Sequence, residues 1–172
     1  MKSRDIVLVA VLLAAGTVLQ YCLSWLNTPI IPDVITAFYC LSIILFWPKV
    51  NEALGIGIIG GALSMMIPGS ILPPANLVSG IVGACCCFYC YELVRDKSNL
   101  APLVSTTSAT LVSGVTFVVI VTVVMFGTIR ATYSTFAGFV LAFLPLIVIT
   151  ALLNAVIIQA LTIVMGKVRA QI

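Results

Sequence analysis

Residues 5–25 read DIVLVAVLLAAGTVLQYCLSW, and this stretch decides the fold. It is almost wholly apolar over residues 6–18 and follows two basic residues, Lys2 and Arg4. At a rise of about 1.5 Å per residue, a helix of this length spans roughly 30 Å, the thickness of the hydrocarbon core of a bilayer. No small-x-small cleavage motif precedes a polar region, so we expect a retained transmembrane helix rather than a cleaved secretory signal.

The composition of the whole chain agrees with this interpretation. Of 172 residues, 62% are hydrophobic and only 8% are charged, whereas soluble domains carry about 25% charged residues. The chain is therefore an integral membrane protein that interacts with the lipid bilayer. It has no phosphate-binding loop motif, so we expect any ATPase to be another chain. The net charge of +3 says little about partners, because in a membrane protein the placement of the basic residues sets topology and does not indicate nucleic-acid binding.

Charged residues decide how many helices lie between residues 34 and 67. A single span there would place Lys49 and Glu52 at the centre of the bilayer, at a cost of several kcal/mol each (about 2.5–3.5 on insertion scales). Two short helices avoid this cost. We therefore predict an all-α membrane protein, one domain over residues 1–172, with six transmembrane helices in a compact bundle. The expected helices are residues 5–26, 33–47, 53–67, 75–94, 102–126 and 136–165.

Six spans also place nearly all basic residues on one side of the membrane. By the positive-inside rule, that side is cytoplasmic, so we expect both termini to be cytoplasmic. The outer side then carries only Arg130. Five spans would scatter the basic residues over both faces. The residues assigned to the cytoplasmic side are Lys2, Arg4, Lys49, Arg95, Lys97, Lys167 and Arg169.

The residue types that usually serve as catalytic groups or metal ligands are scarce in this chain. The chain has no histidine, and the acidic residues near the span ends are Asp33, Glu52 and Glu92. Cys87 and Cys90 form a Cys-x-x-Cys within an apolar segment, with no second pair at the spacing of a metal site. We expect no enzyme activity, no metal and no cofactor.

A ligand pocket is expected at the outer face. Loops 27–32, 68–74 and 127–135 lie there, and the second and third apolar segments are short and interrupted by glycine or proline, as is typical of transporter binding sites. We choose the candidate lining residues by their expected depth in the membrane. They are Trp25, Asn27, Asp33, Tyr39, Asn76, Arg130, Tyr133 and Asn154.

Four of these candidates have explicit alternatives. The guanidinium of Arg130 suits a two-pronged contact with a carboxylate, or it is a solvated or headgroup-anchoring arginine. Tyr133, like Trp25, is equally typical of an interfacial belt. Asn154 lies inside the last helix and should face the bundle, where it contacts ligand or hydrogen-bonds a neighbouring helix.

A second surface is indicated on the first helix. Ala10 and Ala14 are four residues apart, so both methyl groups lie on one face where another helix can approach closely. Such pairs also arise by chance in apolar helices.

The chain resembles the substrate-binding membrane subunits, or S components, of energy-coupling factor (ECF) transporters. Many of these carry Ala-x-x-x-Ala in the first helix, matched here by Ala10 and Ala14. Within that group, Pro-Asp at 32–33, ILFWPK at 44–49 and ALGIG at 53–57 are similar to the tryptophan-transporter subfamily. The resemblance implies a prokaryotic cell-membrane protein whose alanine pair docks on a transmembrane coupling subunit that works with two ATPase subunits.

The resemblance also implies a mechanism in which the subunit captures a nutrient outside and reorients in the membrane. Trp47 departs from the Phe-Pro-Lys turn of the subfamily, so the expected ligand is tryptophan or a carboxylate-bearing vitamin such as pantothenate. The alternative is a small channel or an accessory subunit without solute specificity. The hydroxyl-rich fifth helix favours a channel, unless those hydroxyls bond backbone carbonyls of their own helix.

Overall fold

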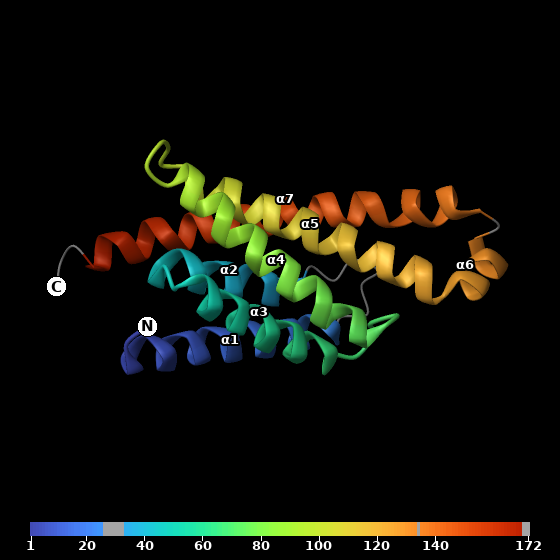
Figure 1. Cartoon of the computed structure of the whole chain (residues 1–172), viewed down its shortest axis with the longest axis horizontal. Coiled ribbons are helices and arrows are strands. Elements are labelled where there is room, and N and C mark those ends of the chain that lie inside the picture. Colours follow the sequence, from blue (N-terminus) through green and yellow to red (C-terminus); the bar gives the residue numbers. More distant parts are fainter. Residues whose placement is uncertain (26–32, 134, 170–172) are drawn as a thin grey trace.

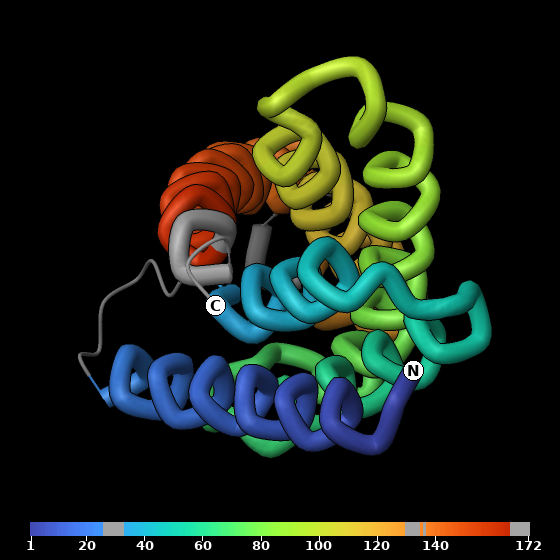
Figure 2. The backbone as a smooth tube through the Cα atoms, turned by 90° about the vertical axis from the view of Figure 1, so that its left-hand side faces the viewer, coloured from blue at the N-terminus to red at the C-terminus, as the bar shows by residue number. Residues whose placement is uncertain are grey.

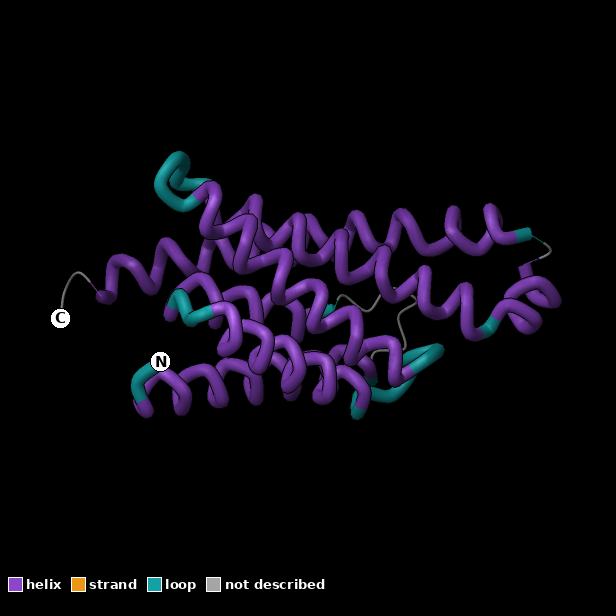
Figure 3. The backbone as a smooth tube through the Cα atoms, in the orientation of Figure 1, coloured by secondary structure: helices purple, strands orange, loops and turns teal. Residues whose placement is uncertain are grey.

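The computed structural model describes residues 1–25, 33–133 and 135–169, with the side chains of all but 130–133, 136 and 166–169. Every regular element in this part of the chain is a helix (Figure 1, Figure 3). The helices are α1 (Ser3–Ser24), α2 (Val34–Phe46), α3 (Val50–Met65), α4 (Pro73–Val94), α5 (Ala101–Val124), α6 (Phe126–Tyr133) and α7 (Phe136–Arg169).

The prediction of an all-helical membrane protein is confirmed. Four helices, α1, α4, α5 and α7, are long and apolar enough to cross a membrane. The helices α2 and α3 are apolar but shorter, with 13 and 16 residues. The break between them lies at Trp47, whose positive φ of 37° gives a left-handed helix end, and at Pro48, which cannot continue the helix.

The helix α6 was not expected, because a polar loop was predicted over residues 127–135. It forms directly after α5, which ends at Val124. Ile129 is 5% exposed and belongs to a second hydrophobic cluster with Val121 of α5 and Phe139 of α7. This burial stabilises a helix that local sequence alone does not predict.

The short helix α2 lies at the centre of the bundle. It contacts α1, α3, α4, α5 and α7, and Figure 2 shows it between α1 and the α4–α5 pair. Most of its side chains are buried, including Ile35, Cys40 and Ile43. Because protein surrounds α2 on all these sides, it need not match the full thickness of the bilayer.

The helices α3 and α4 cross through small residues. A Cβ atom at Gly61 would lie 2.7 Å from the backbone oxygen of Asn76 and 2.8 Å from Cα of Leu77. A Cβ at Gly57 would lie 2.6 Å from Cβ of Ala84. These helices therefore approach at backbone distance, as small residues permit within membranes.

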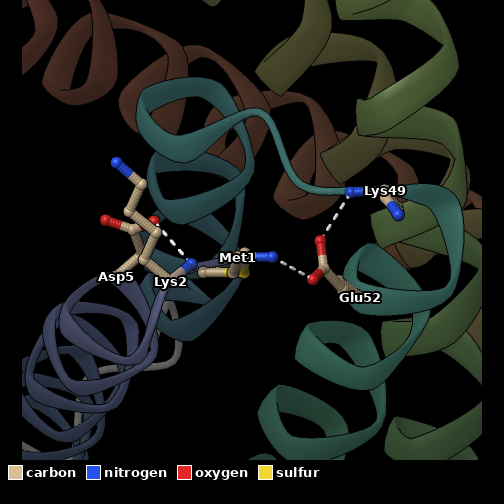
Figure 4. Close-up of polar contacts among 5 residues, drawn as sticks. All are labelled: Met1, Lys2, Asp5, Lys49 and Glu52. Carbon is tan, nitrogen blue, oxygen red and sulfur yellow. Dashed lines mark hydrogen bonds and ion pairs between the residues drawn. The ribbon is translucent and has the colours of Figure 1, made fainter.

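Both the N-terminus and the C-terminal end of α7 lie at one end of the bundle (Figure 1). The starts of α1 and α3 meet there. The Met1 ammonium donates to Glu52 Oε1, and the Lys49 backbone N–H donates to Glu52 Oε2 at 2.7 Å (Figure 4). At the ends of α4 and α2, the guanidinium of Arg95 lies over the ring of Trp47.

Candidate functional site

A cavity of about 230 Å³ lies beyond the N-terminus of α2. Because α2 is short, it starts partway along its longer neighbours and leaves this space between α1, α4, α5, α7 and the loop from α3 to α4. The volume lies somewhat below the usual range for ligand sites, roughly 300–1,000 Å³. The cavity therefore suits a small molecule of about the size of an amino acid.

The floor of the cavity is formed by the capped start of α2. Asp33 accepts hydrogen bonds from Thr36, from the backbone N–H to Oδ1 at 3.3 Å and from Oγ1 to Oδ2 at 2.6 Å. Gln20 of α1 accepts from the N–H groups of Val34 and Ile35, at 2.5 and 3.4 Å. Two side chains thus occupy the first three free N–H groups of the helix.

One wall of the cavity is polar and includes the loop after α3. Asn76 of α4 donates from Nδ2 to the Ser64 carbonyl at 3.3 Å and to Ser70 Oγ at 3.1 Å. Between these residues, Gly69 has a φ of +97°, which a residue with a side chain adopts only with strain. Asn76 therefore fixes the loop that borders the cavity.

The side of the cavity formed by α5 and α7 carries the hydroxyl groups of Thr110, Ser113 and Thr150 and a cluster of apolar side chains. These helices pack closely, because a Cβ at Gly114 would lie 2.7 Å from Cγ2 of Ile147. Phe143 also contacts Phe139, with ring centroids 4.7 Å apart. The apolar cluster can hold the flat or branched apolar part of a ligand. Its residues are Phe117, Val118, Phe143, Leu146 and Ile147.

Asn154 stands behind the floor and does not itself line the cavity. It is fully buried. Its Nδ2 donates to the Asp33 carbonyl at 2.9 Å and to Thr110 Oγ1 at 3.4 Å. One amide on α7 therefore ties the start of α2 to α5, which makes Asn154 a positioning residue for the floor.

We expect Asn154→Leu to destabilise the protein by about 1 kcal/mol, a typical value for an interhelical hydrogen bond in a membrane. The melting temperature should fall by about 2–4 °C. The control is Gln159→Leu on the same helix, where one amide donates to the Asn99 carbonyl at 3.2 Å far from the cavity. Thermal unfolding of the two purified variants measures both melting temperatures. A melting temperature of Asn154→Leu at or above that of Gln159→Leu would contradict the assigned role.

Of the predicted site residues, the structure brings Asp33 and Asn76 together in the cavity, with Asn154 directly behind. Trp25 ends α1 and is 73% exposed, outside the lining. Tyr39 is buried in the main hydrophobic core and does not line the cavity. The remaining candidates cannot be placed, because Asn27 and the side chains of Arg130 and Tyr133 lie outside the described part of the structure.

Several lining residues were not among the predicted site residues, namely Gln20, Ser64, Ser70, Ser79, Thr110, Ser113 and Thr150. The hydroxyl pattern of the fifth helix was the available signal. Thr110 and Ser113 line the cavity, and Thr110 Oγ1 also donates to the Thr106 carbonyl of its own helix at 2.9 Å. Ser105, Thr107 and Thr116 donate to carbonyls of their own helix at 2.6–2.8 Å, which counts against a hydroxyl-lined channel.

A second, largely apolar groove of about 390 Å³ lies between α1 and α3. Ala10 and Ala14 line it, and both are exposed. Gly55 of α3 lies opposite, with no atom within 4 Å of the position of a Cβ. Ala10, Ala14 and Gly55 therefore form a small-residue strip within a groove that is otherwise lined mainly by larger apolar side chains, and a helix can approach closely at this strip.

Comparison with known proteins gives two matches. The family model described as "Tryptophan transporter TrpP" matches residues 2–169. The "probable tryptophan transport protein" of Bacillus subtilis (strain 168) is 30% identical over 121 residues, covering 68% of this chain and 69% of that protein. No solved structure matches.

Proposed function

Since the chain belongs to the tryptophan transporter TrpP family and is a multi-pass protein of a bacterial cell membrane, we propose that it is the substrate-binding subunit of an ECF-type importer for tryptophan. It captures tryptophan outside the cell. An energised partner module, made of a coupling subunit and two ATPases, drives its delivery inward. The family match over residues 2–169 carries this proposal.

The proposed membrane orientation follows from the charged helix ends. The helices α1 to α5 and α7 are the six spans. Lys49 precedes α3 and Arg95 follows α4, at the end of the bundle that also holds the N-terminus. The positive-inside rule makes this end cytoplasmic. The cavity, bordered by the loop from α3 to α4, then opens toward the outside.

The cavity offers the chemistry that an amino acid with an aromatic side chain requires. Its apolar cluster, with Phe117 and Phe143, suits an indole ring, which prefers edge-on or offset contact with other rings. Asn76 and the hydroxyl groups opposite suit polar backbone atoms of the ligand. A few polar groups in a largely apolar pocket are the usual composition of a selective site.

The groove between α1 and α3 is the proposed docking surface for the coupling subunit. Ala10, Ala14 and Gly55 let a partner helix approach closely, and in lipid such packing is the main source of helix association. The groove and the cavity are separate surfaces. Docking and ligand binding are therefore separable by mutation.

Direct binding tests the proposal. The purified chain in lipid nanodiscs is titrated with radiolabelled tryptophan in the absence of any partner subunit or ATP. We expect saturable binding of one tryptophan per chain, with a dissociation constant of about 1 µM or lower (about −8 kcal/mol). Excess unlabelled tryptophan should displace the label, and excess pantothenate should not.

Two results would contradict the proposal. No saturable binding of labelled tryptophan, with saturable binding of labelled pantothenate by the same preparation, would make the chain a vitamin-binding subunit. Absence of saturable binding by a monodisperse, helical preparation would favour a channel or an accessory subunit.

A further inference from the structure

The cavity holds a single ionisable side chain among the described residues that line it. That residue is Asp33, and the other polar lining groups are neutral amides and hydroxyls. No lysine or arginine side chain lines the cavity within the described part of the chain, and a negative charge in a mostly apolar cavity is costly unless a ligand supplies the opposite charge. The question is which part of an amino-acid ligand this carboxylate receives.

The hydrogen bonds of Asp33 leave room for a ligand. Among the residues that the structure describes, only Thr36 donates to its two oxygens, whereas a carboxylate has about four acceptor positions. The ion pairs found among the described residues are Met1 with Glu52 and Arg95 with Asp96. Asp33 takes part in neither.

The start of α2 does not provide a site for an anion. A helix N-terminus attracts anions through its free N–H groups, but Gln20 and Asp33 already accept from the first three of these. A helix end also carries only about half a positive charge. The full charge of the Asp33 carboxylate therefore outweighs it, and the floor favours a cation.

We propose that Asp33 binds the primary ammonium group of the ligand, so that the cavity selects free amino acids and rejects carboxylates that lack an amine. This deepens the proposed function and rests on it. The ammonium lies at the floor and the aromatic side chain lies against Phe117 and Phe143. The hydrogen bond from Asn154 to the Asp33 carbonyl holds the backbone of Asp33, and so keeps its carboxylate at a fixed position relative to Phe117 and Phe143.

Ligand analogues test the proposal on the unmodified protein. Competition with labelled tryptophan is measured for tryptamine, which keeps the amine, and for indole-3-propionate and N-acetyltryptophan, which lack a free ammonium. We expect the two compounds without an ammonium to compete about tenfold to a hundredfold less well than tryptophan, since a hydrogen bond to a charged group is lost. Tryptamine should compete better than indole-3-propionate.

Asp33→Asn tests the residue itself. Asparagine is as good a helix cap as aspartate, so the start of α2 is retained while the charge is removed. We expect tryptophan binding to weaken about tenfold to a hundredfold, with no loss of affinity for indole-3-propionate. Asp96→Asn is the matched control, because Asp96 lies beyond α4 in the loop to α5 and should leave binding unchanged.

The outcomes separate this inference from the proposed function. If the unmodified chain binds tryptophan but binds indole-3-propionate equally well, the ammonium assignment is wrong and the transporter assignment stands. The same holds if Asp33→Asn binds tryptophan with unchanged affinity. If the unmodified chain fails to bind tryptophan at all, the proposed function itself is overturned. Because the analogues are tested on the unmodified chain, they decide the ammonium assignment even if the variant does not fold.

Discussion

Ala14→Trp should abolish ATP-driven tryptophan uptake while leaving the tryptophan affinity of the isolated chain unchanged. Ala14 is exposed and lines the groove between α1 and α3. An indole at this position fills the space that a partner helix would occupy, because small residues are what permit close helix approach in lipid. It displaces no core side chain, so the ligand cavity stays intact.

The measurement is uptake by proteoliposomes that contain the chain with the proposed coupling subunit and ATPases, beside equilibrium binding by the chain alone. Ala15→Trp is the matched control. Ala15 is also exposed, but adjacent helix positions face different directions, and Ala15 does not line the groove. Normal uptake by Ala14→Trp would remove the groove as a docking surface. Lost binding would mean that α1 shapes the cavity directly.

Gly61→Leu should prevent recovery of folded protein. Even the first side-chain atom would lie 2.7 Å from the Asn76 carbonyl oxygen and 2.8 Å from Leu77 Cα. Both are backbone atoms of α4, so they cannot rotate away. Separating α3 from α4 also displaces Asn76, which holds the loop beside the cavity. We expect a cost of at least about 3 kcal/mol, the upper end of ordinary overpacking.

Size-exclusion chromatography and thermal unfolding of the detergent-purified variants measure this effect. Gly55→Leu is the control on the same helix, since a Cβ at Gly55 meets no atom within 4 Å. It should elute and unfold like the unmodified protein. A monodisperse Gly61→Leu with an unchanged melting temperature would show that α3 and α4 need not touch at backbone distance.

Local signals predicted most helix positions well. The second helix was predicted over residues 33–47, and α2 runs from Val34 to Phe46, capped by Asp33 at its start and followed by Trp47 and Pro48 at its end. By contrast, α6 was missed because its stability depends on Ile129 packing against α5 and α7. That contact joins segments whose relation no local pattern encodes.

The candidate site was predicted in part. Asp33 and Asn76 were placed by their depth at helix starts, and both line the cavity. Depth also selected Tyr39, but depth says nothing about which way a residue faces, and Tyr39 points into the core. Gln20 was overlooked because its partners, the N–H groups of Val34 and Ile35, become neighbours only when α1 packs on α2.

By itself, the sequence determined that this protein lies in a membrane and is built of helices, because long apolar stretches in lipid must satisfy every backbone polar group internally. It also determined that Ala10 and Ala14 share one face of α1, since helical periodicity assigns faces, whereas the structure showed that both are exposed. Only the tertiary structure decided which polar groups meet. Gln20, Asp33, Asn76 and Thr110 lie on four different helices or their ends, and they share one cavity because α2 is short and its neighbours are long.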